Sequence, residues 1–213
     1  MGMLANMREE YMKGTLHKSD LHPDPLAQFQ LWFDQIRDME VADANAFTLS
    51  TIDHRGFPTG RVVLLKGIED GRFVFYTNYN SEKGTHLSQH PFCGMTFFWR
   101  ELERQVRITG TVEKVAPEVS DAYFNSRPYG SQLGAVASPQ SNRIESRAWL
   151  EDRWKKLQEE HPEASDIDRP DHWGGFAITP LDFEFWQGRA SRLHDRFRYR
   201  PEGTAWAIER LAP

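Results

Sequence analysis

Short strand-like segments separated by turn residues fill much of the first half of the chain, and this alternation limits its fold more than any other feature. Runs of β-branched, aromatic and aliphatic residues predict strands over residues 46–53, 61–68, 72–78, 94–100 and 105–115. Turn residues such as Asp70–Gly71 separate these runs. Five strands with short connections indicate an antiparallel meander that is large enough for a small barrel.

Helical patterns are expected beside these strands. Asp24 as N-cap and Pro25 in the first turn predict a helix whose apolar stripe faces the core. The stripe consists of Leu26, Phe29, Phe33 and Ile36. Further helices are expected over 81–90 and within 117–159, and final strands around 176–178, 183–186, 192–199 and 205–210.

The predicted class is therefore mainly β, of the α+β type, with flanking helices. Residues 1–22 lack any hydrophobic periodicity and are expected to form a mobile N-terminal arm. Residues 23–213 are then expected to form a single domain, a length that allows a sizeable core.

Composition excludes several classes of protein. The net charge of -5 argues against general nucleic-acid binding, and no apolar run approaches the roughly 20 residues of a membrane span. The N-terminus lacks the apolar segment of a secretory signal. Cys93 is the one cysteine, so no intrachain disulfide can form, and a reducing cytoplasmic location is expected.

A cationic segment near the C-terminus runs against the acidic composition. Residues 184–200 contain five arginines and one histidine. Read as a strand, this segment would direct Arg192, His194 and Arg196 to one face. That face would either line a cleft for an anionic ligand or be a solvated surface, and spacing alone leaves both interpretations open.

Other candidate sites are less specific. Arg61 and Lys66 bracket four aliphatic residues in one predicted strand and would point to opposite faces. A strand-to-helix junction that suits a phosphate contains Tyr76, Thr77, Ser81 and Lys83. A second set, Tyr123, Arg127 and Ser131, recurs every four residues, although Pro128 is expected to begin a new helix there.

A metal site is not expected at His86, His90 and Cys93. The two histidines have helical spacing, but Pro91 interrupts the helix and no fourth ligand is evident. The glycine-rich signatures of dinucleotide and nucleoside-triphosphate sites do not occur.

Several blocks together resemble the pyridoxamine 5'-phosphate oxidase family, in order and from Arg8 to Pro213. They are RVVLLK (61–66), VFYTN (74–78), SEKG (81–84), LERQVRITG (102–110), YFNSRPYGSQLGA (123–135), SPQSNRI (138–144), FWQGRASRLHDRF (185–197) and ERLAP (209–213). The resemblance implies an FMN-binding split β-barrel that forms a homodimer with two shared sites at the subunit interface.

The resemblance also implies a role for each matching residue. FMN would be bound by Arg61, Val62, Val63, Leu64, Leu65, Lys66, Tyr76, Thr77, Ser81, Lys83 and Gln105, and from the partner subunit by Gln140, Ser141, Trp186 and Arg196. The substrate phosphate would be bound by Lys66, Tyr123, Arg127 and Ser131. Arg192 and His194 would be the catalytic pair, contributed by the other chain, and Arg8 and Tyr11 would close over the site.

The implied activity is the oxidation of pyridoxamine and pyridoxine 5'-phosphates to pyridoxal 5'-phosphate. Dioxygen would be the electron acceptor, with hydrogen peroxide as a product and ammonia released from the amine. The sequence departs from the family at Glu82, where an arginine is common beside the FMN phosphate. Two alternatives remain: a split-barrel flavoenzyme with another substrate, and a flavin-binding or haem-handling protein without turnover.

Overall fold

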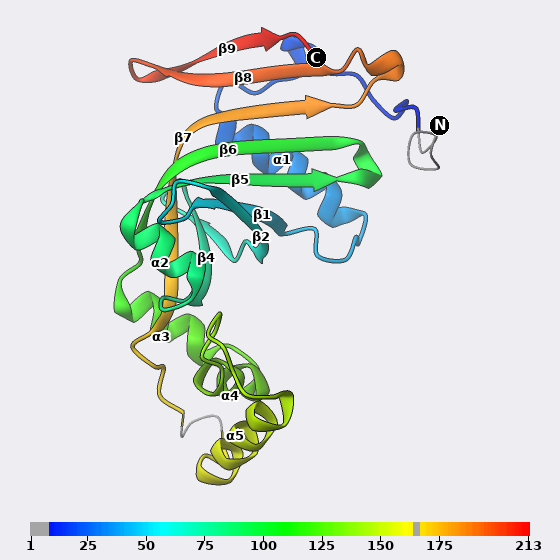
Figure 1. The fold of residues 1–213 in the computed structure, drawn as a ribbon. Coiled ribbons are helices and arrows are strands. Elements are labelled where there is room, and N and C mark those ends of the chain that lie inside the picture. The colour runs from blue at the N-terminus through cyan, green and yellow to red at the C-terminus, as the bar shows by residue number, and fades with distance from the viewer. Residues whose placement is uncertain (1–8, 164–166) are drawn as a thin grey trace.

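A curled antiparallel sheet of nine strands forms the body of the protein in the computed structural model, which describes residues 9–163 and 167–213 (Figure 1). Its main path runs in the order β2-β1-β5-β6-β7-β4-β3, and β8 and β9 extend it from β7. The strands are β1 (Ala46–Ile52), β2 (Pro58–Leu64), β3 (Gly67–Glu69), β4 (Arg72–Asn78), β5 (Phe92–Trp99), β6 (Arg104–Lys114), β7 (Trp173–Gln187), β8 (Asp195–Glu202) and β9 (Ala205–Leu211).

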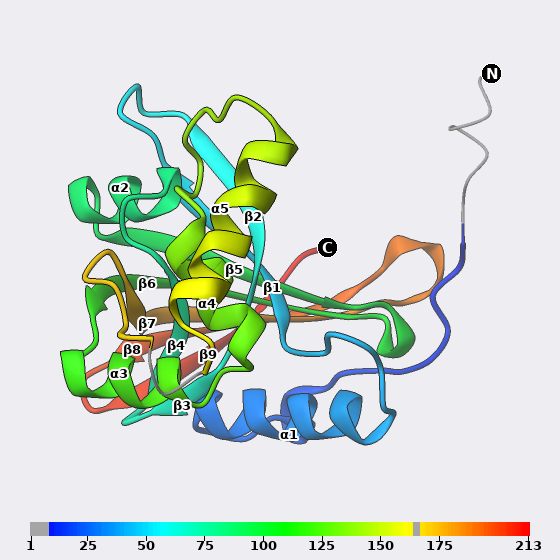
Figure 2. The same ribbon diagram turned by 90° about the horizontal axis from the view of Figure 1, so that it is seen from below.

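Five α-helices flank this sheet: α1 (Pro25–Asp38), α2 (Glu82–Gln89), α3 (Pro117–Asn125), α4 (Tyr129–Ala137) and α5 (Arg147–Glu160). The predicted start of α1 is confirmed, because the Asp24 carboxylate accepts a hydrogen bond from the Leu26 N–H. Helix α1 lies along one side of the sheet (Figure 2), and Figure 1 shows α4 and α5 at the opposite end of the molecule. Its Phe29 and Ile36 are fully buried in the aromatic-rich core inside the curled sheet.

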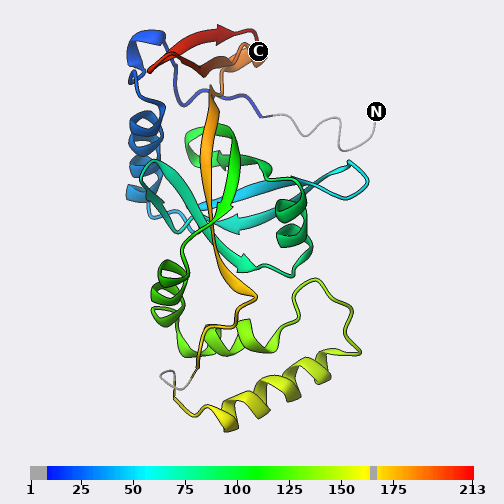
Figure 3. The same cartoon turned by 90° about the vertical axis from the view of Figure 1, so that its left-hand side faces the viewer.

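Strand β7 is the longest strand of the sheet, and on one of its edges the two ends pair with different strands. One edge pairs with β6 along nearly its whole length. On the other edge, residues 173–178 pair with β4 and residues 183–187 pair with β8. In Figure 3 the orange strand accordingly runs from the α3–α5 helices at one end to β8 and β9 at the other.

Three strand predictions were wrong in their boundaries. Residues 176–178 and 183–186 belong to one strand, because Pro180 sits at a β-bulge, where its missing N–H is tolerated. Residues 61–68 are split at Leu65, whose backbone pairs with Asn45 before the chain joins β4. The strand predicted over residues 192–199 begins only at Asp195, because Ser191 and Arg192 have left-handed backbones, with φ of 56° and 62°.

The described part of the N-terminal arm contacts the body of the protein. The Lys13 N–H donates to the Glu103 carboxylate at 2.8 Å, and the Leu16 N–H donates to the Asp195 carboxylate at 3.0 Å. Leu16 itself is buried in the core. These partners are 90 and 179 residues away in the chain, so no local sequence pattern could indicate the contacts. The sequence alone therefore predicts a mobile arm.

The bulge between β6 and β7 generates a stability prediction. A Cβ atom on Gly110 would lie 2.6 Å from the Thr179 carbonyl oxygen and 2.7 Å from Ile178 Cγ2. We expect Gly110→Ala to lower the free energy of unfolding by about 1–3 kcal/mol, because backbone must shift to admit the methyl group. Chemical denaturation at one fixed protein concentration measures the change.

The matched control is Gly130→Ala in α4, where nothing lies within 4 Å of the new Cβ. This variant should be as stable as the parent or more so, because alanine is the better helix former. Equal stability of the two variants would contradict the close approach at the bulge.

Candidate functional site

A cavity of about 630 Å³ opens where β2 ends, beside β4 and the corner between α3 and α4. Its volume is typical of small-molecule sites, which span roughly 300–1,000 Å³. It collects eleven of the residues that the sequence predicts for the two ligands: Val62, Val63, Leu64, Lys66, Tyr76, Thr77, Lys83, Tyr123, Arg127, Ser131 and Gln140.

The start of helix α2 orients one of the cavity's cations. Ser81 is the N-cap, and its fully buried hydroxyl accepts from the Gly84 N–H and donates to the Asn78 carbonyl. Lys83 Nζ, two residues later, donates to Gln140 Oε1 at 2.9 Å and to Thr77 Oγ1 at 3.2 Å. Ser81 therefore positions Lys83 from below the surface and does not itself line the cavity.

The corner between α3 and α4 supplies a second cation. Pro128 is the N-cap residue of α4, as predicted, and the turn leaves the Arg127 guanidinium 4.5 Å from the Trp173 ring centroid. Among the described residues, no hydrogen-bond partner is found for the buried Arg127 Nη1, and burial lowers the pKa of this group. A buried guanidinium nitrogen without a partner is unfavourable unless an anion binds it.

Flat aromatic groups lie beside this arginine. The Tyr76 and Tyr123 rings stack at 3.8 Å with an interplanar angle of 16°, and Trp173 continues the stack behind them. Burial raises the pKa of Tyr76 to about 12, so its phenol stays neutral. Trp173 was not predicted as a site residue, because it lies 46 residues from Arg127 in sequence and carries no motif.

The charges around the cavity have one sign. Lys66, Lys83 and Arg127 line it, and no carboxylate is found among its described lining residues. Burial and the neighbouring charge of Arg61 lower the pKa of Lys83, and Glu82 opposes them. In a chain with net charge -5, such a concentration of cations suits an anionic ligand.

Arg61 and Leu65, which belong to the predicted FMN set, lie outside this lining. The Arg61 guanidinium donates to the hydroxyls of Thr51 and Thr59, both at 2.7 Å. Burial lowers the pKa of Arg61, and Glu82 partly offsets that effect. The Leu65 side chain is 6% exposed and belongs to the core. Because the strand breaks at Leu65, the alternation of side chains along a single strand does not apply to Arg61 and Lys66. The two side chains nevertheless have different surroundings.

A second group of predicted residues gathers at the other end of β7. Gln105, Trp186 and Arg196 are register partners across β6, β7 and β8. The Trp186 ring lies 4.6 Å from the His194 ring and 5.5 Å from the Tyr11 ring, between centroids. Arg8, the other residue predicted to close over the site, lies outside the described residues.

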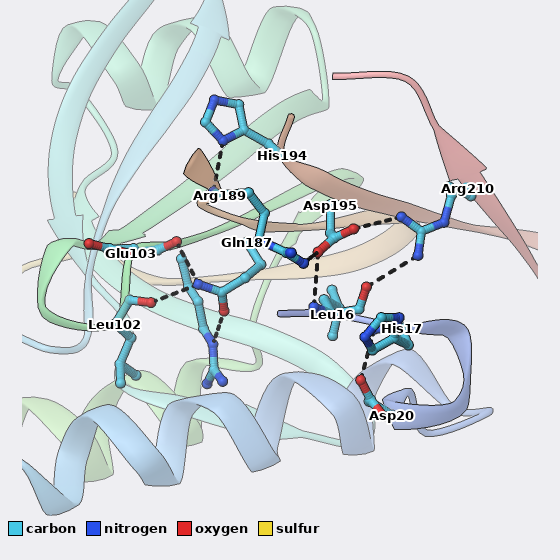
Figure 4. Close-up of polar contacts among 11 residues, drawn as sticks. Leu16, His17, Asp20, Leu102, Glu103, Gln187, Arg189, His194, Asp195 and Arg210 are labelled. Atoms are coloured by element: carbon cyan, nitrogen blue, oxygen red, sulfur yellow. Dashed lines mark hydrogen bonds and ion pairs between the residues drawn. The ribbon is translucent and has the colours of Figure 1, made fainter. Parts of the chain in front are cut away.

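His194 is oriented by its own loop. The Arg189 N–H donates to His194 Nδ1 at 3.1 Å (Figure 4). The neutral ring therefore carries its proton on Nε2. Burial and then the charge of Arg192 lower the pKa of His194. The predicted strand alternation does not apply to Arg192 and His194, because both precede β8: Arg192 ends the tight Ala190–Arg192 turn, and His194 follows it.

Three arginines of the cationic segment are paired with buried carboxylates. Glu184 is 4% exposed and accepts from Arg196 Nε at 2.9 Å, with Arg107 and Arg198 within 3.9 Å. Arg196 also donates to the Ala212 carbonyl. Arg196 is therefore ion-paired with Glu184 in its own chain. Glu184 had no sequence signal of its own, because its partners come from two other strands, β6 and β8.

Two glutamines are placed differently from what the resemblance implied. Gln140 was assigned to the partner subunit, yet it lies in the cavity of its own chain, bonded to Lys83 and Thr77. Gln105 was assigned to the cavity, yet it lies beside Trp186. Ser141 lines a second cavity of about 410 Å³, which Glu82 also borders.

The two groups of residues are separated by the length of β7. Trp173 and Trp186 are thirteen positions apart on this strand, a contour of roughly 40 Å at about 3.3 Å per residue. No hydrogen bond or ring contact is found between the two groups in the part of the chain that the structure describes. One chain therefore does not bring them to a common ligand.

Residues 9–163 and 167–213 contain neither a cluster of metal ligands nor a membrane-spanning helix. No group of three or more His, Cys, Asp and Glu side chains there could hold a metal ion. His86 is buried with Nδ1 beside the Thr51 hydroxyl, and burial raises the pKa of the Cys93 thiol to about 12. None of the helices in those residues is both long and apolar enough to cross a membrane.

Known families match almost the whole chain. Residues 33–161 match the model described as pyridoxamine 5'-phosphate oxidase, and residues 173–213 match the C-terminal dimerisation region of pyridoxine 5'-phosphate oxidase. The chain belongs to the pyridoxamine 5'-phosphate oxidase family. The resemblance noted in the sequence is thereby confirmed, as is the split-barrel fold, and the dimerisation region indicates a homodimer.

Relatives agree with this membership. The chain is 50% identical to a pyridoxine/pyridoxamine 5'-phosphate oxidase of Salinibacter ruber and 51% identical to one of Paraburkholderia phymatum, with 100% of each chain covered in both cases. The crystal structure of PhzG from Burkholderia lata, in complex with tetrahydrophenazine-1-carboxylic acid, superposes with a TM-score of 0.86. That comparison has 26% identity and covers 93% of this chain and 98% of PhzG.

An FMN-binding protein of Nostoc punctiforme shares the fold at 16% identity. Its TM-score is 0.70, over 87% of this chain and 96% of that one.

Glu82 provides a test of how the cavity binds a phosphate group. This carboxylate is exposed in the first turn of α2, and its charge acts on both Lys83 and Arg61. We expect Glu82→Arg to lower the Kd of FMN about tenfold, because a repelling charge becomes a bidentate donor. Fluorescence titration of the apoprotein with FMN at low and high salt measures the effect.

Glu118→Arg is the matched control, since Glu118 is exposed in the first turn of α3 and does not line the cavity. It should leave the Kd unchanged. A Glu82→Arg variant that binds FMN no more tightly than the parent would mean that residue 82 points away from the phosphate.

Proposed function

We propose that this protein is an FMN-dependent oxidase that converts pyridoxine and pyridoxamine 5'-phosphates to pyridoxal 5'-phosphate. Full-length relatives at about 50% identity carry that activity in their names. The observation that supports it most within the structure is the buried, unpartnered Arg127 Nη1 in a cavity lined by cations and stacked aromatic rings.

The cavity fits the phosphate of FMN on its α2 side. Lys83 and Thr77 would bind that phosphate with Gln140, and Val62–Leu64 would lie against the flavin. Arg61 supports this side through its charge and its bonds to Thr51 and Thr59. When bound, FMN supplies the redox chemistry by accepting two electrons from the substrate and passing them to dioxygen, which gives hydrogen peroxide.

The substrate phosphate would occupy the α3–α4 side of the same cavity. Lys66 and Arg127 supply charge there, and the hydroxyls of Tyr123 and Ser131 supply donors. Arg127 is held in place by the Trp173 ring beneath it, so little side-chain freedom is lost on binding. Two separate anionic groups explain why three cations meet in one cavity.

The second group of residues would complete the site from the partner subunit. Trp186, Arg196 and Gln105 would cover the flavin, and Arg192 and His194 would meet the pyridine ring of the substrate. His194 would donate a hydrogen bond from Nε2, since Nδ1 is already occupied by the Arg189 N–H. Its lowered pKa keeps the ring neutral near pH 7 and suits this donor role.

The enzyme is expected to act in the cytoplasm on small phosphorylated substrates. Its one cysteine is a buried, protonated thiol, which fits a reducing compartment. Nucleic acid is not expected as a partner, because the cations gather in one cavity of small-molecule size and the chain as a whole is acidic.

The direct test is a spectroscopic assay of the flavin. The purified protein should be yellow, pyridoxamine 5'-phosphate should bleach the flavin without air, and oxygen should restore the colour. Bleaching by neither phosphorylated compound would overturn the proposed activity and would favour a flavin-binding protein without turnover.

Arg127→Gln tests the substrate assignment in the same assay. We expect the KM for pyridoxamine 5'-phosphate, measured by oxygen uptake, to rise about 10- to 100-fold with little change in bound flavin, because one charged hydrogen-bond donor is lost. Activity on unphosphorylated pyridoxamine should not distinguish the variant from the parent. Arg153→Gln on the exposed face of α5 is the control and should leave the KM unchanged.

A further inference from the structure

Asp195 lies at the start of β8 and joins three segments that are distant in the sequence. It is 7% exposed. Its Oδ2 accepts from the Leu16 N–H at 3.0 Å and from Arg189 Nη1 at 2.8 Å, and its Oδ1 accepts from Arg210 Nη1 at 2.7 Å. Figure 4 shows these donors converging on the carboxylate from the N-terminal arm, the β7–β8 loop and strand β9.

The carboxylate is well suited to hold these segments together. Burial alone would raise the pKa of Asp195, but the hydrogen bonds from Arg210, Leu16 and Arg189 outweigh it and the pKa is lowered. Arg210 closes a ring by also donating to the Leu16 carbonyl at 3.2 Å. An amide at position 195 would present N–H groups to some of these donors, so the arrangement requires a charged acceptor.

Two of the joined segments carry residues that are assigned to the proposed site. On the arm, Tyr11 packs on Gly188 so closely that a Cβ there would lie 2.7 Å from Tyr11 Cγ. On the loop, Arg189 bonds Asp195 through its side chain and His194 through its backbone N–H. Tyr11 and His194 contact each other and Trp186, with the Tyr11 and His194 ring centroids 5.8 Å apart.

We propose that Asp195 is a positioning residue that couples the N-terminal arm to the β7–β8 loop, so that Tyr11 and His194 are presented to the substrate as one unit. The inference rests on the proposed function, since the two rings matter for catalysis only where they meet substrate. Asp195 itself touches neither ring and acts through Leu16 and Arg189.

The first readout needs no substrate. We expect Asp195→Asn to speed tryptic cleavage after Lys13 and Lys18 about tenfold, because the arm opens more often once the carboxylate is lost. Both lysines are exposed and flank Leu16 in sequence. Glu209→Gln is the matched control, because Glu209 pairs with Arg200 on the same strand pair without reaching the arm, and it should cleave like the parent.

The second readout is a double-mutant cycle on the FMN-loaded enzyme. Tyr11→Leu should lower kcat/KM for pyridoxamine 5'-phosphate by about tenfold in the parent and by less than about threefold in the Asp195→Asn background, because the arm is already released there. A residue that only stabilises the fold would give additive losses at a temperature where all four proteins are folded.

Additive losses, or unchanged cleavage after Lys13 and Lys18, would overturn the proposal. Should Asp195→Asn not fold, Arg189→Met removes one of the three donors from a half-exposed side chain and keeps the backbone bond to His194. Like Asp195→Asn, it should speed tryptic cleavage and reduce the effect of Tyr11→Leu on kcat/KM, each by a smaller factor. Because cleavage is measured without substrate, an absence of oxidase activity would count against the proposed function and leave the coupling of arm and loop testable.

Discussion

The length of strand β7 determines how this molecule can build a site. One end of the strand pairs with β4 and places Trp173 beneath Arg127, while the other end pairs with β8 and places Trp186 beside His194. A β-strand is stiff and extended, so the two ends cannot approach each other within one chain. The cavity at the first end and the ring cluster at the second can meet only if two chains lie against each other.

The arginines of this acidic protein divide into two kinds by their partners. On the C-terminal sheet, Glu184 and Asp195 are buried acceptors for arginines from several strands, and these pairs organise the structure. Arg127, in contrast, has a buried nitrogen with no acceptor within the described residues. Unpaired buried charge is unfavourable, and it is retained where a ligand supplies the missing anion.

Local signals in the sequence predict the elements that depend on neighbouring residues. The cap at Asp24, the short helix near Ser81 and the separate helix after Pro128 agree with the sequence, because each needs only a few residues in a row. The grouping of Tyr123, Arg127 and Ser131 at one corner has the same local origin.

Non-local pairing explains the errors. The break at Leu65 depends on Asn45 and Val74, and the continuity of β7 through Pro180 depends on a bulge opposite Gly110. The left-handed turn at Ser191 and Arg192 uses no glycine and left no signal in the sequence. The roles of Trp173 and Asp195 follow from contacts that only the folded chain brings together.

The sharing of each site between two chains can be tested most directly with hybrid dimers. Arg127→Gln impairs the cavity and His194→Ala impairs the ring cluster, so each variant alone should have little activity at a substrate concentration near the parental KM. When the two are unfolded together and reassembled, half of the dimers should be hybrids with one intact site, and about a quarter of the parental activity should return. Activity that stays at the level of the separate variants would show that each chain builds its own site, which would contradict this account.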